Sequence, residues 1–330
     1  MKFGLWFDFR NPPAWRRPYA EIYDEALEQI VWAEGAGFSS VVLSEHHVTE
    51  DGYLPSIFPA LAAIAARTTT IRIGTAVLLA PFYHPIRFAE DAAFVDQLSG
   101  GRLDLGLGLG YREREFELLG VPIEERASRT EELVRIARIA WTGEPFTFHG
   151  DHWQFDNVVV TPTPLQPAGP SLWLGGTSPA AARRAGRLGC HWMPDASVSA
   201  ERHTIYRDAL AAGGYEAGAF MTTVAATIIV SDDPERAWAE VAPHLLYQHD
   251  EYRRWQGKAP IGTVEKLPRD GYIVGTPDGV ADAVAALAAT NHPDLLFFWA
   301  RPPGLALEAS RRSLELFAEH VLPRFEAVCQ

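Results

Sequence analysis

Two adjacent histidines, His46 and His47, lie in the segment SEHHVTEDGYLP, directly after the apolar residues 41–43. A histidine can transfer a proton near neutral pH, and it is also a common metal ligand. Successive residues of a strand point to opposite sides, and the i, i+4 spacing of a helical metal pair is absent, so no metal site is expected. If Ser44 faces inward, His46 does too. We expect His46 either to transfer a proton or only to order its loop by hydrogen bonds.

Short apolar runs rich in strand-forming residues alternate with helical patterns along the chain. We expect strands at residues 3–7, 40–44, 71–79, 102–109, 172–174, 190–193, 221–230 and 294–299. We expect helices after them at residues 21–36, 57–68, 86–98, 126–141, 179–188, 200–212, 234–254 and 305–325. Residues 145–164 predict an inserted hairpin that turns at Gly150 and Asp151. Residues 255–272 are expected to form a mobile loop after the seventh strand, before a helix near 278–289.

Eight strand–helix units favour a closed (β/α)₈ barrel, the TIM barrel, over an open sheet. A chain of 330 residues is within the range of one such barrel, so residues 1–330 are expected to form a single domain. Continuous apolar runs such as LLFFW suit parallel strands that are buried on both faces. Active sites of these barrels lie at the C-terminal ends of the strands, which is where His46 is placed.

The composition limits the classes of partner. The formal net charge is −13, which argues against nucleic acid or anionic membrane as a partner, because both are bound mainly by Lys and Arg. No apolar run has transmembrane length, and the N-terminus does not have the pattern of a signal peptide. The two cysteines, Cys190 and Cys329, provide neither a disulfide framework nor a zinc site. We expect a cytoplasmic protein that acts on a small molecule.

Glycines gather at the end of the fourth strand, in DLGLGLGY, at Gly106, Gly108 and Gly110. The spacing resembles a dinucleotide fingerprint, but that motif needs a helix that opens at once after the first strand of a βαβ unit. Here residues 111–122 are expected to form a loop. We interpret the three glycines as leaving room for a bulky ligand. Aromatic residues near strand ends, including Trp6 and Trp299, could line an apolar substrate pocket or simply belong to the core.

The end of the fifth strand predicts an anion site. Its residues are Gly175, Gly176, Thr177 and Ser178. Ser178 is a favourable N-cap and Pro179 a favourable first helical residue, so the preceding loop exposes backbone N–H groups at a helix N-terminus. An ordinary capped helix is the alternative. Arg126 and Arg129 open the helix after the fourth strand, where they either reach the same anion or pair with neighbouring glutamates on the surface.

These segments resemble those of a known family almost end to end. The chain resembles the bacterial luciferase-like flavin-dependent monooxygenases, whose fold is a (β/α)₈ barrel. The matching segments are EHHVTEDGY, the long block of residues 73–121, LWLGGTSPAAARRAG, YIVGTPDGVAD and LELFAEHVLPRF. The block of residues 73–121 is the most specific of them.

The resemblance implies roles for individual residues. His46 matches an active-site histidine near the reactive edge of the flavin. Ala76 and Val77 match a non-prolyl cis peptide bond under the isoalloxazine ring, and Tyr111 matches an aromatic residue beside it. Residues 175–178 match the loop that binds the flavin phosphate, assisted by Arg126 or, alternatively, Arg129.

Two residues depart from the luciferase pattern. Gly108 stands where luciferase has a reactive cysteine, which would enlarge the pocket beside the flavin. Leu109 stands where luciferase has an arginine that contacts the phosphate. Both departures argue against light emission, and neither removes the expected flavin site. Residues 257–270 resemble the mobile lid of the family.

The resemblance implies a two-component monooxygenase. Reduced FMN would come from a separate flavin reductase, since this chain shows no nicotinamide-binding unit, and O₂ and a small organic substrate would react at the barrel mouth. A homodimer is the family expectation. One alternative is a deazaflavin-dependent oxidoreductase of the same superfamily that transfers a hydride without oxygen. The other is a flavin-binding subunit without catalytic activity.

Overall fold

The computed structural model describes residues 1–194 and 198–326, and Cys329 lies outside them. Eight parallel strands form one sheet in the order β8-β7-β4-β3-β2-β1-β12-β9. Their bounds are β1 Lys2–Phe7, β2 Ser40–Leu43, β3 Arg72–Leu79, β4 Leu103–Gly108, β7 Ser171–Gly175, β8 His191–Met193, β9 Thr223–Ala226 and β12 Leu295–Trp299. The predicted (β/α)₈ barrel is confirmed.

The barrel closes between β8 and β9, the two ends of this strand order. In the part of the chain that the structure describes, one isolated parallel bridge, Trp192 to Thr222, joins the two sides. The Trp192 N–H donates to the carbonyl of Met221 at 3.2 Å. This junction is called the seam below. It has fewer backbone hydrogen bonds than the continuous ladders elsewhere in the sheet.

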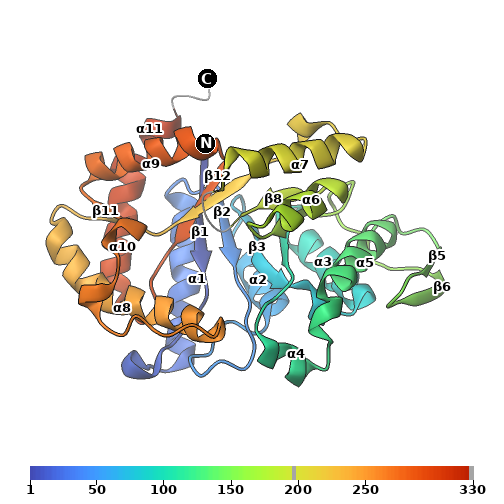
Figure 1. Cartoon of the computed structure of the whole chain (residues 1–330), viewed down its shortest axis with the longest axis horizontal. Coiled ribbons are helices and arrows are strands. Elements are labelled where there is room, and N and C mark those ends of the chain that lie inside the picture. The colour runs from blue at the N-terminus through green and yellow to red at the C-terminus, as the bar shows by residue number, and fades with distance from the viewer. Residues whose placement is uncertain (195–197, 327–330) are drawn as a thin grey trace.

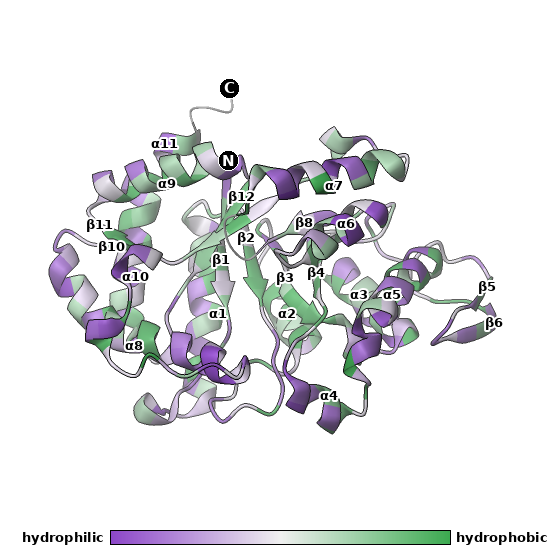
Figure 2. Ribbon diagram, in the orientation of Figure 1, coloured by the Kyte–Doolittle hydropathy of each residue, from purple (hydrophilic) through white to green (hydrophobic). Residues whose placement is uncertain are grey.

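Helices surround the barrel (Figure 1). They are α1 Tyr19–Gly35, α2 Ile57–Ala65, α3 Pro85–Ser99, α4 Glu113–Leu119, α5 Arg126–Ala140, α6 Pro179–Arg187, α7 Ala200–Ala212, α8 Pro234–Trp255, α9 Pro277–Asn291, α10 Leu307–Leu316 and α11 Pro323–Glu326. Hydrophobic colour follows the inner strands β2 and β3, whereas the short peripheral helix α4 is mostly hydrophilic (Figure 2). Parallel strands are buried on both faces, which accounts for the uninterrupted apolar runs in the sequence.

The inserted hairpin is confirmed. It consists of β5 Phe146–His149 and β6 Gln154–Val158, paired antiparallel, and it projects from the barrel beside α5 (Figure 1). The carboxylate of Glu132 on α5 accepts hydrogen bonds from the backbone N–H groups of residues 151–153, at 2.7 to 3.3 Å. The buried side chain of Glu132 therefore holds the turn at Gly150 and Asp151 against α5.

Two sequence predictions about elements were wrong. The predicted strand 221–230 is two strands, because after β9 the chain leaves the barrel and β10 Ile228–Val230 pairs in parallel with β11 Ile273–Gly275 in a separate sheet. The segment 111–122 was expected to be a loop, but residues 113–119 form α4. This helix ends at Gly120, whose φ of 69° is the left-handed conformation that glycine adopts easily.

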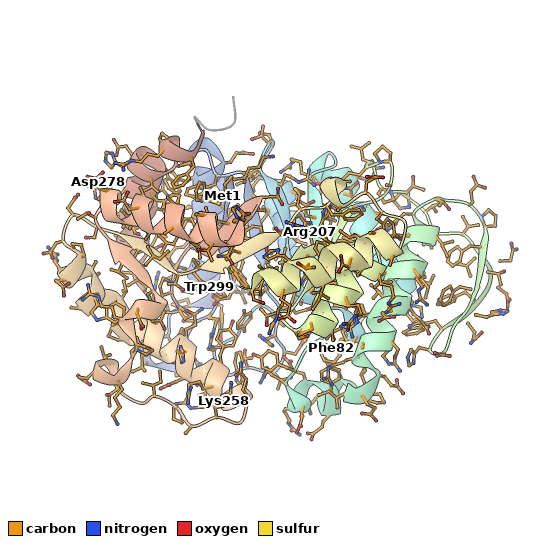
Figure 3. All side chains as sticks on the ribbon, turned by 45° about the horizontal axis from the view of Figure 1, so that its top comes forward. Met1, Phe82, Arg207, Lys258, Asp278 and Trp299 are labelled. Carbon is orange, nitrogen blue, oxygen red and sulfur yellow. The ribbon has the colours of Figure 1, made fainter. Side chains whose placement is uncertain are left out.

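The loop after α8 contains the short 3₁₀ helices η5 Val264–Lys266 and η6 Arg269–Gly271. Asp250 on α8 accepts hydrogen bonds from the N–H groups of Ile261 and Gly262 at 2.5 and 3.0 Å. The predicted mobility of this loop stays a prediction. Trp299 at the end of β12 lies toward the middle of the molecule, whereas Lys258 in this loop lies at its periphery (Figure 3). Over the described residues, no helix combines the length and apolar character needed to cross a bilayer.

Candidate active site

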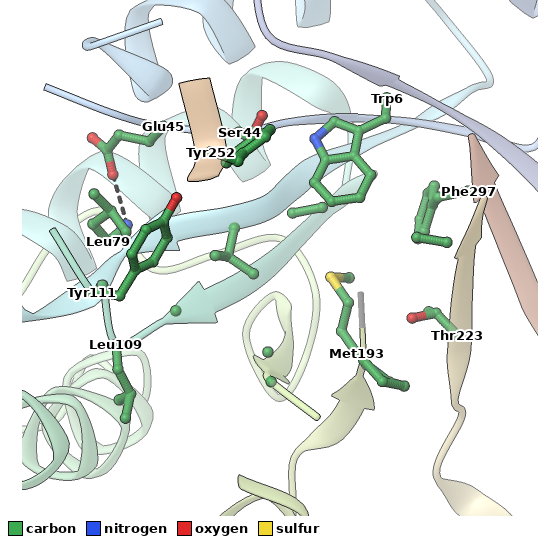
Figure 4. A pocket seen from close by; sticks show the side chains of 18 of the residues that line it. Trp6, Ser44, Glu45, Leu79, Leu109, Tyr111, Met193, Thr223, Tyr252 and Phe297 are labelled. Atoms are coloured by element: carbon green, nitrogen blue, oxygen red, sulfur yellow. Dashed lines mark hydrogen bonds between the residues drawn. The ribbon is translucent and has the colours of Figure 1, made fainter. Parts of the chain in front are cut away.

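A cavity of about 650 Å³ opens at the C-terminal ends of the strands (Figure 4). Of the residues predicted from the sequence, those that line it are His46, Ala76, Val77, Gly108, Tyr111, Gly175, Gly176 and Ser178. Its volume is within the range of small-ligand pockets. Tyr111 is 40% exposed, so it lies at the rim. Thr177, Arg126 and Arg129 do not line this cavity in the part of the chain that the structure describes.

His46 is held by a carboxylate that the sequence did not reveal. Its Nδ1 lies 3.0 Å from Oε1 of Glu115 on α4. The same oxygen accepts hydrogen bonds from the backbone N–H of His47 at 2.7 Å and from Nη1 of Arg112 at 2.8 Å. The His46 ring is buried and lines the cavity. Because Nδ1 is engaged by Glu115, Nε2 is the ring nitrogen left for a group in the cavity.

The electrostatics of this pair favour a neutral imidazole beside a carboxylate. Burial lowers the pKa of His46, and the hydrogen bond and charge of Glu115 offset this only in part. Burial would raise the pKa of Glu115, but the hydrogen bonds from His46 and His47 and the charge of Arg112 hold it below its usual range. An ionised Glu115 can only accept a hydrogen bond, so Nδ1 must donate it. The ring proton of the neutral imidazole is therefore on Nδ1. Nε2 then carries a lone pair and can accept a hydrogen bond or a proton.

His47 points away from His46. Its Nε2 lies 3.4 Å from Oε1 of Glu45, and its ring packs against Phe82. Burial lowers the pKa of His47, but Glu45 outweighs that effect and raises it. Glu45 also accepts hydrogen bonds from the Leu79 N–H at 2.7 Å and the Tyr83 hydroxyl at 2.6 Å, so it ties the end of β2 to the end of β3. Within residues 1–194 and 198–326, no three His, Cys, Asp or Glu side chains are grouped as a metal site.

Four aromatic rings surround His46 and are called the aromatic collar below. Tyr53 and Trp255 lie 4.9 Å from the imidazole between ring centroids, Tyr111 lies 5.6 Å away and Tyr252 6.4 Å. Tyr53 comes from the loop after β2, and Tyr252 and Trp255 come from the last turn of α8. The Tyr53 hydroxyl lies 3.0 Å from that of Tyr252, so the end of α8 is bonded directly to the barrel.

Two guanidinium groups support the collar from behind. Arg10 is fully buried, pairs with Asp51 at 2.6 Å, and lies 5.2 Å from the ring centroids of both Tyr53 and Trp255. Arg112 lies 4.4 Å from the Trp255 ring. Burial raises the pKa of the neighbouring Asp8 to about 6, although Arg10 lowers it in part. Cations against aromatic faces are attractive, most of all where water is excluded.

The end of β3 forms the floor of the cavity. The peptide bond between Ala76 and Val77 is cis, as the resemblance implied, and the pairing of β3 with β4 shifts register between Thr75 and Leu78. The glycine interpretation needs a correction here. A Cβ at Gly108 would overlap Cγ2 of Val77. The space at this glycine therefore admits the bulged end of β3 rather than a ligand, although Gly108 still lines the cavity.

The loop of residues 175–178 borders the cavity at the start of α6. Ser178 caps this helix, since its Oγ accepts from the Ala181 N–H at 3.1 Å. Among the described residues, the backbone N–H groups of Thr177 and Ser178 have no acceptor. Arg202 on α7 donates to the Thr177 carbonyl at 2.8 Å. The loop therefore has the free N–H groups of an anion site at a helix N-terminus.

A different arginine from the predicted pair reaches the cavity. Arg184 on α6 lines it, with its Nε 3.1 Å from Glu131. Arg126 donates to the Ile123 carbonyl at 2.8 Å, and Arg129 pairs with Glu125 at 2.8 Å. The sequence offered a signal for Arg184, because it belongs to the AAARRAG segment directly after the predicted anion loop.

Comparison with known proteins identifies the family. The family model described as luciferase-like monooxygenase matches residues 1–291. The chain belongs to this family. The resemblance predicted from the sequence is therefore confirmed.

The chain is 32% identical to the oxygenase component of a flavin-dependent trigonelline monooxygenase from Acinetobacter baylyi, over 58% of this chain and only 53% of that one. It is 28% identical to an F420-dependent glucose-6-phosphate dehydrogenase from Nakamurella multipartita, over 92% of this chain and 93% of the relative. A crystal structure of a monooxygenase from Streptomyces bottropensis superposes with a TM-score of 0.86 at 28% identity, covering 98% of this chain and 100% of the other.

Proposed function

We propose that the protein is a flavin-dependent monooxygenase that uses reduced FMN and O₂ to oxidise a small organic substrate. One observation carries the proposal. A single cavity joins His46, kept neutral and oriented by Glu115, to the anion loop at the start of α6, across the floor at Val77. A molecule with a flat reactive ring near His46 and one phosphate at the anion loop fits this arrangement.

The residues present fit such a cofactor. The free N–H groups of Thr177 and Ser178 would hold the phosphate at the positive end of the α6 dipole, and Arg184 would add a charge. Ala76, Val77 and Gly108 would support the ring from the floor. When bound, reduced flavin supplies the electrons that activate O₂.

The chain's own residues supply orientation and proton handling. Nε2 of His46 accepts a hydrogen bond or a proton from the group bound in front of it, because Glu115 keeps the ring proton on Nδ1. The aromatic collar packs around the imidazole and leaves His46 only 6% exposed, and limited access of water strengthens electrostatic interactions at this nitrogen. The trigonelline enzyme is matched through its oxygenase component, which supports a separate reductase as the source of reduced flavin. A homodimer remains our expectation.

A second candidate function is hydride transfer by a deazaflavin. The F420-dependent relative supports it, because the match extends over 93% of that enzyme. The same cavity would hold either cofactor, and only the monooxygenase would consume oxygen.

Anaerobic titration with reduced FMN and, in parallel, with reduced F420 tests these functions. We expect reduced FMN to bind and, once oxygen is admitted, to be oxidised on the protein with kinetics that differ from those of free flavin. Selective binding of F420 would replace the monooxygenase with hydride transfer. Binding of neither would leave a flavin-free, non-catalytic role. His46→Ala should bind FMN and lose most of the product-forming turnover, since positioned general bases contribute about 10²–10⁴-fold.

A further inference from the structure

An aromatic wall lies across the cavity from Tyr111. The rings of Trp6 on β1 and Trp299 on β12 are stacked, with centroids 4.4 Å apart and an interplanar angle of 15°. Trp6, Met193 and Phe297 point into the same part of the cavity, across from Tyr111 (Figure 4). Small residues, Ala225 and Ala226 on β9, line the same side. A flat apolar ligand can lie against such a wall with its ring face covered.

Charges that could hold an ionic substrate are already engaged. Among the described residues, Glu45 and Arg184 are the lining residues with a carboxyl or guanidinium group. Glu45 is fully buried and takes hydrogen bonds from Leu79 and Tyr83. Arg184 pairs with Glu131 and lies on α6, on the side assigned to the phosphate. An anion bound near His46 would be buried without a partner, which is costly.

A cationic substrate meets a different obstacle. Aromatic collars often bind cations, but here Arg10 and Arg112 already lie against the Trp255 ring, and Arg10 also lies against Tyr53 and Tyr252. A second cation against the cavity-lining rings of Tyr53 and Tyr252 would be repelled by the Arg10 guanidinium, which lies 5.2 and 5.7 Å from their centroids. The acids beside these arginines are Asp8, Asp51 and Glu115. Asp51 and Glu115 are each paired with one of the guanidinium groups, and Asp8 accepts a hydrogen bond from the Arg10 backbone N–H at 3.1 Å.

We infer that the substrate is an uncharged, flat and largely apolar molecule, such as an aromatic ring system that carries a carbonyl or hydroxyl group. The inference rests on the proposed function and names the substrate class of the same cavity. Trp6 is assigned as a specificity-determining residue because it forms the face of the wall and contacts no reacting group of the chain.

Three matched probes test the inference on the FMN-loaded protein by calorimetry: neutral 2-acetylnaphthalene, anionic 2-naphthoate and cationic 2-naphthyltrimethylammonium. The neutral probe should bind at least about tenfold more tightly than either ion, which corresponds to about 1.4 kcal/mol. Trp6→Ala should weaken binding of the neutral probe by at least about tenfold, because the probe loses one ring-stacking partner and the area buried against it. Trp6→Leu, which keeps an apolar side chain, serves if the alanine variant does not fold. Trp238→Ala, near the start of α8, where the ring packs against Tyr272 and neither residue lines the cavity, is the control and should leave binding unchanged.

The outcomes separate this inference from the proposed function. Equal or tighter binding of an ion, loss of FMN as the probe binds, an unaffected Trp6 variant, or no binding of the neutral probe would each overturn the substrate class. FMN binding is measured in the same samples before any probe is added. If FMN fails to bind while the neutral probe binds through Trp6, the proposed function fails and the preference of the cavity for neutral ligands stands. If FMN binds and 2-naphthoate is preferred, the proposed function stands and the inferred substrate class fails.

Discussion

At the scale of single residues, the chemistry depends on a pair rather than on a histidine alone. Glu115 takes the Nδ1 side of His46, and its remaining partners, the His47 N–H and Arg112, keep it ionised. Burial then keeps the imidazole neutral near pH 7. The combination yields one defined tautomer with its lone pair toward the cavity. Arg112 matters indirectly, because without it a buried carboxylate beside a neutral ring would lack a compensating charge.

Replacing Glu115 by Gln should change the pH profile as well as the rate. Both the hydrogen bond and the charge of Glu115 raise the pKa of His46 against burial, so removing them lowers that pKa further. Activity that needs neutral His46 falls as pH decreases through the pKa, so the acid limb of kcat/KM should move to lower pH. At pH 7 turnover should fall by at least about tenfold, because the tautomer is no longer fixed.

The control for this change is Glu117→Gln, on the exposed side of the same helix, where Glu117 pairs with Arg114. Its pH profile should match that of the unchanged protein. An acid limb that stays in place in Glu115→Gln, measured from pH 5 to 9, would mean that the carboxylate only orders the loop.

His46 could be found from the sequence because strand periodicity and its place at a strand end point it inward. Glu115 could not. It lies 69 positions later, on a short helix in a segment that was expected to be a loop, and only the folded chain brings the two together. The same holds for Arg10, whose partners Asp51, Tyr53 and Trp255 come from two distant segments. Local patterns predict which face a residue occupies, but they do not predict partners across the barrel.

At the scale of elements, the floor of the cavity depends on close packing of β3 against β4. Gly108→Ala should destabilise the fold by about 1–3 kcal/mol, the usual cost of overpacking, because its Cβ would overlap Cγ2 of Val77. Adding Val77→Ala removes that methyl and should recover most of the loss. Urea unfolding of the two single variants and the double variant measures the coupling. Purely additive effects would show that Gly108 has another reason to be there.

The end of α8 packs against His46 through Trp255, whose ring also contacts Arg10 and Arg112. In Trp255→Ala these contacts are lost, so the last turn should open more often. Trypsin should then cleave after Arg253 or Arg254 at least about threefold faster, since proteolysis follows the population of the open form. Trp255→Phe should preserve most protection, and Trp238→Ala, near the start of α8, should not change cleavage at this end. Equal cleavage rates in all variants would show that the Trp255 contacts do not hold the last turn of α8 in place.

The sequence predicted nearly every barrel element, because parallel strands leave continuous apolar runs and their helices leave amphipathic ones. It missed the break between β9 and β10, since the apolar run continues through residues 223–230 while the hydrogen-bond partner changes from β12 to β11. It missed α4 because residues 113–119 are too short and too polar for a clear period. Pairing partners and short surface helices are decided by tertiary contacts.

At the scale of the whole molecule, the barrel is continuous except at the seam. The β3–β4 ladder extends over most of both strands, whereas β8 and β9 share one bridge in the described residues. The cavity is lined from both sides of this junction, by Met193 at the end of β8 and Pro194 after it, and by Thr223 and Ala225 on β9. A ligand that contacts both sides should therefore stabilise the barrel at the seam, where the strands share the fewest backbone hydrogen bonds.

Hydrogen exchange followed by mass spectrometry tests this arrangement. Without flavin, amides of residues 191–193 and 222–226 should exchange at least about tenfold faster than those of β3 and β4, because local opening follows the number of ladder hydrogen bonds. Bound FMN should slow hydrogen exchange of the seam amides, since a ligand that binds only the closed form stabilises that form by mass action. The hairpin of β5 and β6 is distant from the cavity lining and should not respond, which makes it the internal control. A seam as protected as β3 before flavin is added would show that the helices α6 and α7 close the barrel without help from the ligand.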